Sequence, residues 1–363
     1  MQITQLELTG FRNIESAVIT PCEGVNIIWG DNAQGKTNLL ESIWLFTGCR
    51  SFRGAKDAEC VSFNSQKASL SLDYFGEGRE QNLLLSIEKT RRFTRNGIKL
   101  SSPAKVMGSF LAVVFSPVHL SLVKEGPYER RRFLDVAISQ LKPKYALALN
   151  GYNKALAQRN ILLKDIVYHS ELYDTLDVWE EQIAFYASEL IAQRIGYINR
   201  LQSFATEIYG GISNGRETMD LVYQEACATG AQTKEEMRSA MRDLLRAARK
   251  NDLVTGSTSV GPHRDDLLIK IDGLSARSYA SQGQQRSAAL ALKLGEAAVI
   301  RNFTGEQPVA LLDDVMSELD TSRQNYILNH IRDWQVFITC CDPASVHNLK
   351  YGQAIHMKNG TVL

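Results

Sequence analysis

Apolar and polar residues alternate over the first 29 positions of the chain, a pattern that is typical of half-buried β-strands. Ile3 and Leu6 are two of these apolar positions, and the apolar run 25–29 ends directly before Gly30. Beyond Gly30, apolar residues recur at helical spacing over 39–46. The pattern therefore predicts two or three strands, then a loop at Gly30, then a helix.

Two further alternating runs, 68–75 and 82–89, predict additional strands in the same region. The Asn96-Gly97 pair that follows is a strong signal for a type I′ hairpin turn, because both residue types tolerate positive φ. We therefore expect an antiparallel layer beside the first strands.

The middle third of the chain changes to long, charged segments with a helical period. The predicted helices cover 128–141, 144–166, 171–209 and 234–250, with a turn at 210–215. These segments indicate a helical arm.

Strand and helix signals alternate again after the arm, with strands predicted at 267–271, 309–312 and 336–339 and a helix at 322–332. The sequence thus favours an α/β head that the arm divides into two parts. The predicted domains are a first head part (1–126), the helical arm (127–255) and a second head part (256–363).

Composition places few limits on function. Hydrophobic residues make up 44% of the chain and charged residues 22%, which is ordinary for a globular protein. No apolar run approaches the ~20 residues of a membrane-spanning helix, and the N-terminus lacks the features of a secretory signal. We therefore expect a cytoplasmic protein without a membrane partner. The formal net charge of +1 leaves nucleic-acid binding open, since that depends on local patches.

The six cysteines are scattered, without Cys-x-x-Cys pairs or histidine clusters at metal-ligand spacing. This distribution predicts reduced, buried thiols.

The loop after the third predicted strand carries the most specific motif. Its residues, 30–37 (GDNAQGKT), fit the phosphate-binding pattern G-x-x-x-x-G-K-[ST] between a strand and a helix. Such a loop presents backbone N–H groups to phosphate, and Gly30 and Gly35 let the backbone curl. Lys36 is expected to reach the β and γ phosphates of ATP, and the Thr37 hydroxyl to ligate Mg²⁺. The alternative is a glycine turn with a solvated lysine.

The apolar run 309–312 ends in Asp313 and Asp314, as when a buried strand delivers carboxylates to the ligand-binding edge of a sheet. Asp313 is the expected Mg²⁺ ligand, and Asp314 is expected to orient or deprotonate the attacking water. Without the phosphate loop, an ordinary turn with solvated acids would be an equal interpretation.

A second helix start lies at 281–286 (SQGQQR), before an alanine-rich and leucine-rich helical run. Ser281 and Gly283 are suited to binding another phosphate through free N–H groups. Taken alone, Ser281 is more simply interpreted as a helix N-cap.

These three elements, followed by Ser317 to Asp320, resemble the ATP-binding-cassette (ABC) heads of the SMC and RecF families. The RecF family is the closer resemblance, carried by 10–13 (GFRN), 126–135 (GPYERRRFLD) and 261–266 (GPHRDD). It implies an ABC-type P-loop ATPase head with an antiparallel β subdomain and an inserted helical arm. It also implies a DNA-repair function, a homodimer that ATP assembles on DNA, and RecR and RecO as partners. The shortness of the arm argues against an SMC protein.

The resemblance extends the candidate nucleotide site. Ser281 to Gln284 becomes the signature segment that closes on ATP held by another subunit. The full set of expected cofactor-binding residues is Arg12, Gly30, Asp31, Asn32, Ala33, Gln34, Gly35, Lys36, Thr37, Asn38, Ser281, Gly283 and Gln284. Lys36, Asp313 and Asp314 are the expected catalytic residues.

Two departures from the family pattern affect the catalytic groups. Many cassette ATPases have Glu where this chain has Asp314, one methylene shorter, so slow hydrolysis is expected. The switch histidine of those ATPases is also missing, and Thr339 or Asp342 is the candidate replacement, because His347 lies too far along the chain.

Basic patches are the candidates for DNA binding. The hairpin 89–99 holds five basic residues and no acid, and Arg91, Arg92 and Arg95 are its central members. Arg130 and Arg131 open the arm, and a stripe of four arginines runs along 238–249. Each patch is equally open to the simpler interpretation of a solvated surface. For His263, a structural contact between arm and head is preferred over a ligand contact.

Three other functions share some of these motifs. A transporter ATPase would ordinarily hold phosphate loop and signature in one continuous domain, whereas about 245 residues separate Lys36 from Ser281 here. A P-loop phosphotransferase would have no use for 281–286. A DNA-binding scaffold that uses ATP structurally remains a nonenzymatic alternative.

Overall fold

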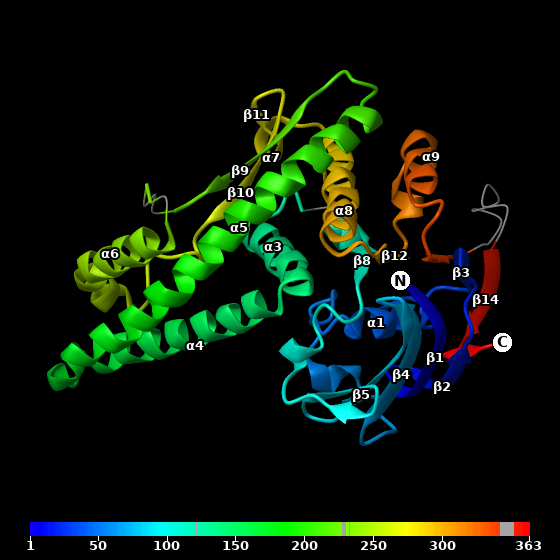
Figure 1. Ribbon diagram of the computed structural model, residues 1–363, viewed down its shortest axis with the longest axis horizontal. Coiled ribbons are helices and arrows are strands. Elements are labelled where there is room, and N and C mark those ends of the chain that lie inside the picture. Colours follow the sequence, from blue (N-terminus) through cyan, green and yellow to red (C-terminus); the bar gives the residue numbers. More distant parts are fainter. Residues whose placement is uncertain (121, 227–229, 232, 342–351) are drawn as a thin grey trace.

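The computed structural model describes residues 1–120, 122–226, 230–231, 233–341 and 352–363. Two sheets form the head on one side of the molecule, and helices α4, α5 and α6 extend away from it as the arm (Figure 1). Both chain ends lie in the head, so the arm is an insertion between two head segments (Figure 1).

The parallel sheet of the head collects strands from distant parts of the sequence. Its order is β15-β14-β3-β13-β12-β8, and only the short edge strand β15 runs antiparallel to its neighbour. The strands are β3 (Val25–Trp29), β8 (Ala112–Phe115), β12 (Val309–Leu312), β13 (Val336–Cys340), β14 (Gly352–Lys358) and β15 (Thr361–Val362). Every residue of β8, β12 and β13 is buried, as expected for a parallel sheet covered on both faces.

The second sheet is antiparallel, in the order β2-β1-β4-β5-β6-β7. Its strands are β1 (Gln2–Phe11), β2 (Ile14–Ile19), β4 (Ala68–Gly76), β5 (Arg79–Ile87), β6 (Arg91–Arg95) and β7 (Ile98–Lys99). The predicted hairpin turn is confirmed, because Asn96 and Gly97 both have positive φ and β6 pairs with β7. Helix α1 (Lys36–Leu45) buries Leu39, Leu40 and Ile43 in a core shared by both sheets.

The predicted arm helices are confirmed with small shifts at their ends. They are α3 (Pro127–Leu141), α4 (Pro143–Asp165), α5 (Leu176–Ile212) and α6 (Lys234–Thr255). Two long helices complete the second head part, α8 (Gln282–Thr304) and α9 (Thr321–His330). The short helices are α2 (Pro117–Leu120) and α7 (Ala276–Tyr279), with 3₁₀ turns η1 (Asp57–Cys60), η2 (Pro103–Lys105), η3 (Ser170–Thr175) and η4 (Met316–Glu318).

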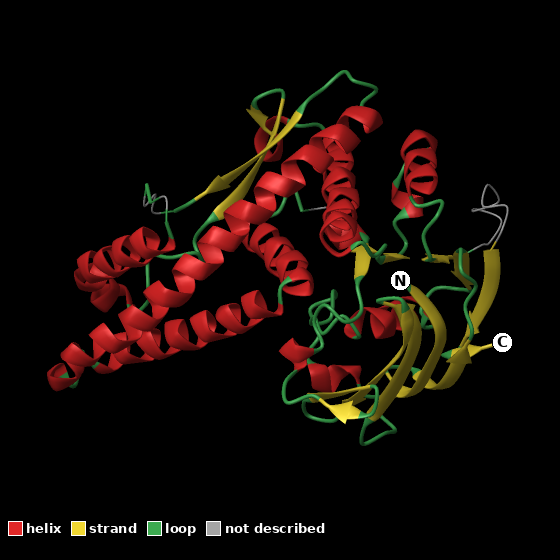
Figure 2. Ribbon diagram, viewed as in Figure 1, coloured by secondary structure: helices red, strands yellow, loops and turns green. Residues whose placement is uncertain are grey.

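Sequence reasoning missed strand β9 (Met219–Gln224). It pairs antiparallel with β10 (Asp266–Ile271), and β11 (Leu274–Ser275) completes a three-stranded sheet beside α5 (Figure 2). Only six residues long and next to a glycine-rich turn, β9 gives too short an alternation to stand out. It joins the predicted arm to the segment that returns to the head.

Cys49, Cys60 and Cys340 are buried as predicted, and Cys22 is half-buried. The expectation of burial is wrong for Cys341, which is exposed at the end of β13. Cys227 lies outside the described residues.

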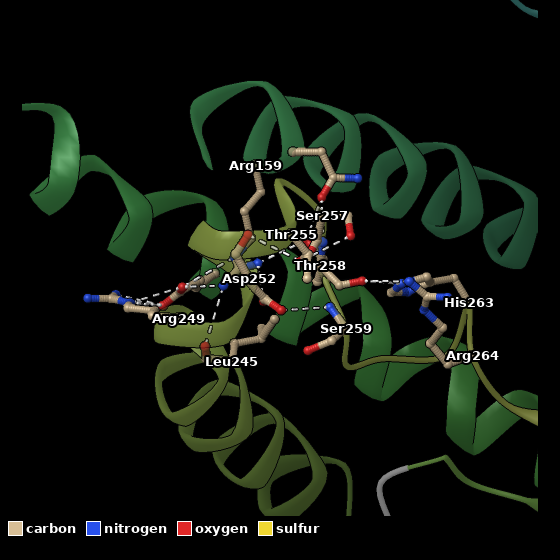
Figure 3. A network of polar contacts seen from close by, with 12 residues as sticks. Arg159, Leu245, Arg249, Asp252, Thr255, Ser257, Thr258, Ser259, His263 and Arg264 are labelled. Atoms are coloured by element: carbon tan, nitrogen blue, oxygen red, sulfur yellow. Dashed lines mark hydrogen bonds and ion pairs between the residues drawn. The ribbon is translucent and has the colours of Figure 1, made fainter. Parts of the chain in front are cut away.

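A buried ionic network ties the three long arm helices together (Figure 3). Arg159 of α4 is fully buried; it donates to Glu180 of α5 at 2.9 Å and to Asp252 of α6 at 2.7 Å. It also donates to the hydroxyl of Thr258 at 2.9 Å. Arg249 of α6 adds a 2.6 Å contact to Glu180. Since the guanidinium groups satisfy both carboxylates, the network fixes how the helices pack.

The arginine stripe of α6 faces acidic residues of α5. Arg238 and Arg242 pair with Glu181, and Arg246 and Arg249 pair with Asp177. Each arginine of the stripe is therefore paired with a carboxylate of α5, although Arg238, Arg242 and Arg246 remain partly exposed to solvent and only Arg249 is largely buried.

Replacing the buried guanidinium should weaken the arm. Arg159→Met leaves Asp252 and Glu180 buried with less compensation, so the free energy of local opening should fall by about 3–5 kcal/mol. Hydrogen exchange of the α6 amides measures this quantity. The control Arg246→Met removes an exposed pair and should change it by less than about 1 kcal/mol. Equal effects of the two variants would show that burial of Arg159 does not matter.

Candidate nucleotide site

The predicted phosphate loop lies where β3 ends and α1 begins. Gly30, Ala33 and Gly35 all have positive φ, which curls the loop and leaves Asp31 to Ala33 exposed. Gly30 has no substitute on steric grounds, since a Cβ there would lie 2.2 Å from the carbonyl oxygen of Met357. The loop therefore has the shape that the motif requires.

Lys36 folds back over the loop. Its ammonium group donates to the carbonyl oxygens of Gly30 at 2.7 Å and Asp31 at 2.9 Å, and the side chain is buried. These contacts hold a positive charge at the centre of a loop whose exposed backbone faces outward. The position suits the phosphate contact that the sequence predicts for Lys36.

A hydrogen bond joins the phosphate loop to the carboxylates that follow β12. The Thr37 hydroxyl, in the first turn of α1, donates to Asp313 Oδ1 at 2.8 Å, just beyond the end of β12. Burial raises the pKa of Asp313, and the neighbouring carboxylate of Asp314 raises it further, while the Thr37 hydrogen bond opposes both. The motif that predicts a metal site thus has its two expected protein ligands in contact.

Thr339 at the end of β13 links both carboxylates. Its hydroxyl accepts a hydrogen bond from the Asp314 backbone N–H at 2.8 Å and donates to Asp313 Oδ1 at 3.2 Å. This contact arises because β13 lies between β3 and β12 in the sheet. Thr339, one of the two candidates for the switch position, therefore lies at the site. Asp342 and His347 lie outside the described residues.

The C-terminal hairpin supports the phosphate loop from behind, a contact that sequence reasoning missed. The Gly360 N–H donates to the carbonyl oxygen of Gln34 at 3.0 Å. In the adjoining strand β14, His356 stacks on Trp29 with ring centroids 3.9 Å apart. Trp29 ends the strand that leads into the loop, so the hairpin fixes the loop at both of its sides.

Arg12 lies beside α1. Its guanidinium contacts both carboxylate oxygens of the buried Glu41, at 2.9 and 3.0 Å, so part of its hydrogen-bonding capacity is used within the head. Asn38 accepts from Arg53 at 2.8 Å and donates to Asn13 at 2.7 Å. Sequence reasoning did not single out Arg53, because no motif marks it.

A cavity of about 1030 Å³ opens next to these side chains, lined by Arg12, Asn13, Asn38, Arg53 and residues of 58–66. It lies beside the start of α1, where the phosphate loop ends. The cavity is large enough for the base and sugar of a nucleotide whose phosphates contact the loop.

The signature segment begins α8. Ser281 is the N-cap: its hydroxyl accepts from the Gln284 N–H at 3.2 Å, and the Gln284 side chain accepts from the Ser281 N–H at 2.7 Å. This capping box confirms the simpler interpretation of Ser281. Among the described residues, no hydrogen bond or ion pair connects 281–284 with the phosphate loop of the same chain.

Two arginines connect the signature segment with the loop that follows Asp314. Arg323 donates to the carbonyl oxygen of Gly283 at 3.0 Å and also pairs with Asp320, the N-cap of α9. Arg286 donates to the Glu318 backbone carbonyl at 2.8 Å. These hydrogen bonds connect the segment Ser317 to Asp320 with the signature segment.

The arginines proposed to bind DNA differ in their burial and in their ion pairs. Arg91 is nearly buried and pairs with Asp57 at 3.0 Å, and Arg130 is buried with two contacts to Asp266 at 2.8 and 2.9 Å. These two side chains stabilise the fold and present no free charge. Arg95 pairs with Glu77, whereas Arg92 is exposed.

Arg131 is only partly committed, because it donates to the backbone carbonyl of Asp265 at 2.7 Å and to no described carboxylate. His263 donates from Nε2 to the Thr258 carbonyl at 3.1 Å, and its Nδ1 lies 2.6 Å from the hydroxyl of Tyr152 in α4. These contacts agree with the structural role preferred for His263.

The oxygen ligands at the loop fit Mg²⁺ bound together with phosphate. Mg²⁺ in nucleotide sites is usually held by one or two protein oxygens, phosphate oxygens and water. Thr37 and Asp313 supply such a pair, 2.8 Å apart. No group of three or more His, Cys, Asp or Glu side chains that could form a closed metal cage occurs among the described residues.

Comparisons with known proteins agree with this site. The model of the RecF/RecN/SMC N terminal domain matches residues 2–362. The DNA replication and repair protein RecF of Acetivibrio thermocellus is 38% identical over 99% of this chain and 98% of its own length. That of Agathobacter rectalis is 39% identical over 100% and 99%.

Solved structures give the same result. The recombination mediator protein RecF-ATPrS in the RecFOR pathway has a TM-score of 0.93 and 37% identity, covering 99% of this chain and 97% of its own. An Smc head domain from Pyrococcus furiosus has a TM-score of 0.54 at 17% identity and covers 99% of this chain, a likeness of fold alone.

The divided head, the phosphate loop and the inserted arm define an ABC-type ATPase of the RecF and SMC class. Within that class, the chain belongs to the RecF family of DNA replication and repair proteins.

The support from the C-terminal hairpin is testable at Gly360, which has positive φ and whose added Cβ would lie 1.9 Å from the carbonyl oxygen of Asn13. Gly360→Ala should push the hairpin off the loop and weaken ATP binding by about ten-fold, since such strain costs on the order of 1–3 kcal/mol. Titration with ATP measures the change.

Gly78→Ala is the matched control, because Gly78 also has positive φ but an added Cβ there would meet nothing within 4 Å. It should lower stability slightly and leave ATP affinity unchanged. If both variants bind ATP like the unmodified chain, the hairpin does not support the loop.

Proposed function

We propose that this chain is a Mg²⁺-dependent ATPase that acts in DNA replication and repair as an ATP-gated DNA clamp. ATP joins two copies of the chain on DNA, and slow hydrolysis releases them. The observation that carries this proposal is the contact between Thr37 and Asp313, which links the phosphate loop to the carboxylates of a distant segment. Membership of the RecF family supports the same function.

Each polar group at the loop has a proposed task in hydrolysis. Lys36 and the loop N–H groups bind the β and γ phosphates, and Thr37 with Asp313 would hold the metal, which supplies positive charge at those phosphates. Asp314 orients and deprotonates the attacking water. Thr339 positions Asp314 through its backbone N–H and carries no charge of its own.

The base and sugar are proposed to lie in the cavity beside Arg12, Asn13 and Arg53. Asn38 stands between this cavity and the phosphate loop, held by Asn13 and Arg53. In this arrangement the phosphate loop would bind the phosphates, and the residues of the cavity would contact the base and sugar.

The homodimer follows from the signature segment. Ser281 to Gln284 makes no contact with the phosphate loop of its own chain, yet it begins a long helix whose first N–H groups favour an anion. A second copy would bring this helix start to the γ-phosphate. ADP lacks that phosphate, so ATP should favour the dimer.

The proposed DNA surface is the hairpin 89–99. Within it, we assign DNA contacts only to the basic side chains that are exposed and unpaired. Lys89, Arg92 and Lys99 are exposed, and their side chains have no hydrogen-bond or ion-pair partner among the described residues. Because phosphate contacts need unpaired positive charge, these three replace Arg91 and Arg130 in the proposal.

The RecF relatives are described as recombination mediators of the RecFOR pathway. By that relationship we propose RecO and RecR as partners, with recombinase loading on single strands as the outcome. A transporter subunit is the less favoured alternative, because β3 and β12 bring phosphate loop and carboxylates together across an inserted arm. None of the described helices is long and apolar enough to span a membrane.

The water-activating role of Asp314 gives a kinetic prediction. Asp314→Asn should bind ATP within a few-fold of the unmodified chain but slow single-turnover hydrolysis by about 100-fold or more, because the general base is lost. ATP-bound dimers should then accumulate. Asp333→Asn, an exposed carboxylate elsewhere, is the control. Loss of ATP binding would instead assign Asp314 a structural or metal-binding role.

The DNA surface gives a salt-dependence prediction. Replacing Lys89, Arg92 and Lys99 by Gln should weaken binding and reduce the slope of log K against log salt by about 2.7, since about 0.9 is lost per duplex phosphate contact. Fluorescence titration at several salt concentrations measures the slope. Arg216→Gln, an exposed position near the end of α5, should leave it unchanged. A triple variant with the original slope would place the DNA surface elsewhere.

A further inference from the structure

A second cavity, of about 400 Å³, lies between the arm and the head, away from the phosphate loop. Helices α3 and α4 form most of its wall, and the segment after α1 closes the head side with Cys49 and Arg50. In Figure 1 this is the region where α3 and α4 face the head. Its volume is in the range of small-molecule sites.

The cavity carries more positive than negative charge. Arg50, Arg131, Arg132 and Arg194 line it, against a single carboxylate, Asp135. Arg194 donates a hydrogen bond to the Asp135 carboxylate at 2.8 Å. Burial lowers the pKa of Arg131, and nearby Arg194 lowers it further, as expected where cations outnumber anions.

Two of these arginines have side-chain N–H groups that donate to no described residue. Arg50 is exposed, and its side chain has no hydrogen bond or ion pair with any described residue. Among the described residues, the Arg131 side chain donates only to the Asp265 carbonyl, through Nη1. Arg132 is more committed, since it donates to the carbonyls of Ser51 and Phe52. An anion entering the cavity would therefore meet Arg50 and Arg131 first.

The inner wall is fixed before any ligand arrives. Tyr152 contacts His263 Nδ1 at 2.6 Å, and His263 Nε2 donates to the Thr258 carbonyl at 3.1 Å. The Thr258 hydroxyl accepts from Arg159, so the cavity wall continues into the buried arm network (Figure 3). Burial lowers the pKa of His263 to about 4, which keeps the ring neutral near pH 7. A preformed wall reduces the entropy lost on binding.

The rim offers contacts for more than a phosphate. The side-chain amides of Asn150 and Asn153 are exposed and make no hydrogen bond with described residues. Tyr128 is 66% exposed and presents its ring at the same cavity. An aromatic face and free amides are the groups that stack on a nucleobase and bond to its edge.

We propose that this cavity is a second phosphate-binding site that takes a nucleotide-sized phosphate monoester, separate from the ATP site. Arg50 and Arg131 bind the phosphate, and Tyr128, Asn150 and Asn153 contact the base. The phosphate belongs either to a free mononucleotide or to the 5′-phosphorylated end of a DNA strand, which present the same chemical group. The proposal does not depend on ATP hydrolysis.

The test uses the full chain with its phosphate loop saturated by Mg²⁺ and a nonhydrolysable ATP analogue. Calorimetric titration with thymidine 5′-monophosphate should show binding, and thymidine should bind at least about ten-fold more weakly because charge-assisted hydrogen bonds are lost. Arg50→Gln and Arg131→Gln should each weaken the monophosphate by about ten-fold. Arg301→Gln, an exposed arginine near the end of α8, should have no effect.

The Arg50 side chain has no hydrogen bond or ion pair with the residues that the structure describes, so its variant remains decisive even if Arg131→Gln disturbs folding. Displacement of the monophosphate by a 5′-phosphorylated oligonucleotide, but not by its 5′-hydroxyl counterpart, would identify a strand end as the ligand. Displacement by neither would identify a free nucleotide. The proposal is overturned if the monophosphate does not bind at millimolar concentration, if thymidine binds equally well, or if Arg50→Gln binds like the unmodified chain.

Discussion

The hydrogen bond from Thr37 to Asp313 spans 276 positions of sequence, and the candidate metal site depends on it. It forms because β3 and β12 run parallel on either side of β13, which brings their carboxyl ends to one edge of the sheet. Between these two strands the chain forms α1, most of the second sheet and β8 within the head, and then leaves the head for the arm before it returns. The second sheet and the arm occupy that interval without separating the two strands.

Buried charges join the helices of the arm. Arg159 holds carboxylates from two other helices, and Arg249 joins the same set. One end of this network reaches Thr258 and His263, in the segment that returns to the head. A change in arm position therefore has a physical route to the strands that follow. The signature helix α8 comes next along the chain and packs against α5.

Sequence reasoning located the groups that short motifs mark. The phosphate loop, the two carboxylates and the capped start at Ser281 depend on local spacing, and the fold places them as those motifs require. The resemblance to the RecF family, confirmed by the comparisons, supplied the overall architecture.

Features that depend on tertiary contacts were not predictable in the same way. The contact of Thr339 with both carboxylates follows from strand order, and the hairpin at Gly360 supports a loop some 325 positions away. Arg91 and Arg130 look identical to solvated arginines in a sequence, yet both are paired and nearly buried. Charge alone does not reveal whether an arginine stabilises a fold or contacts a ligand.

The central claim is that two chains share each ATP site, and mixing two inactive variants tests it directly. Lys36→Arg misplaces the charge that contacts the phosphates, and Ser281→Arg obstructs the signature offered to the partner. Each variant alone should hydrolyse ATP near background. Their equimolar mixture should recover up to about one quarter of the unmodified rate, because half of random dimers pair one intact loop with one intact signature. Undiminished hydrolysis by Ser281→Arg alone, or a mixture that stays at background, would contradict the shared site.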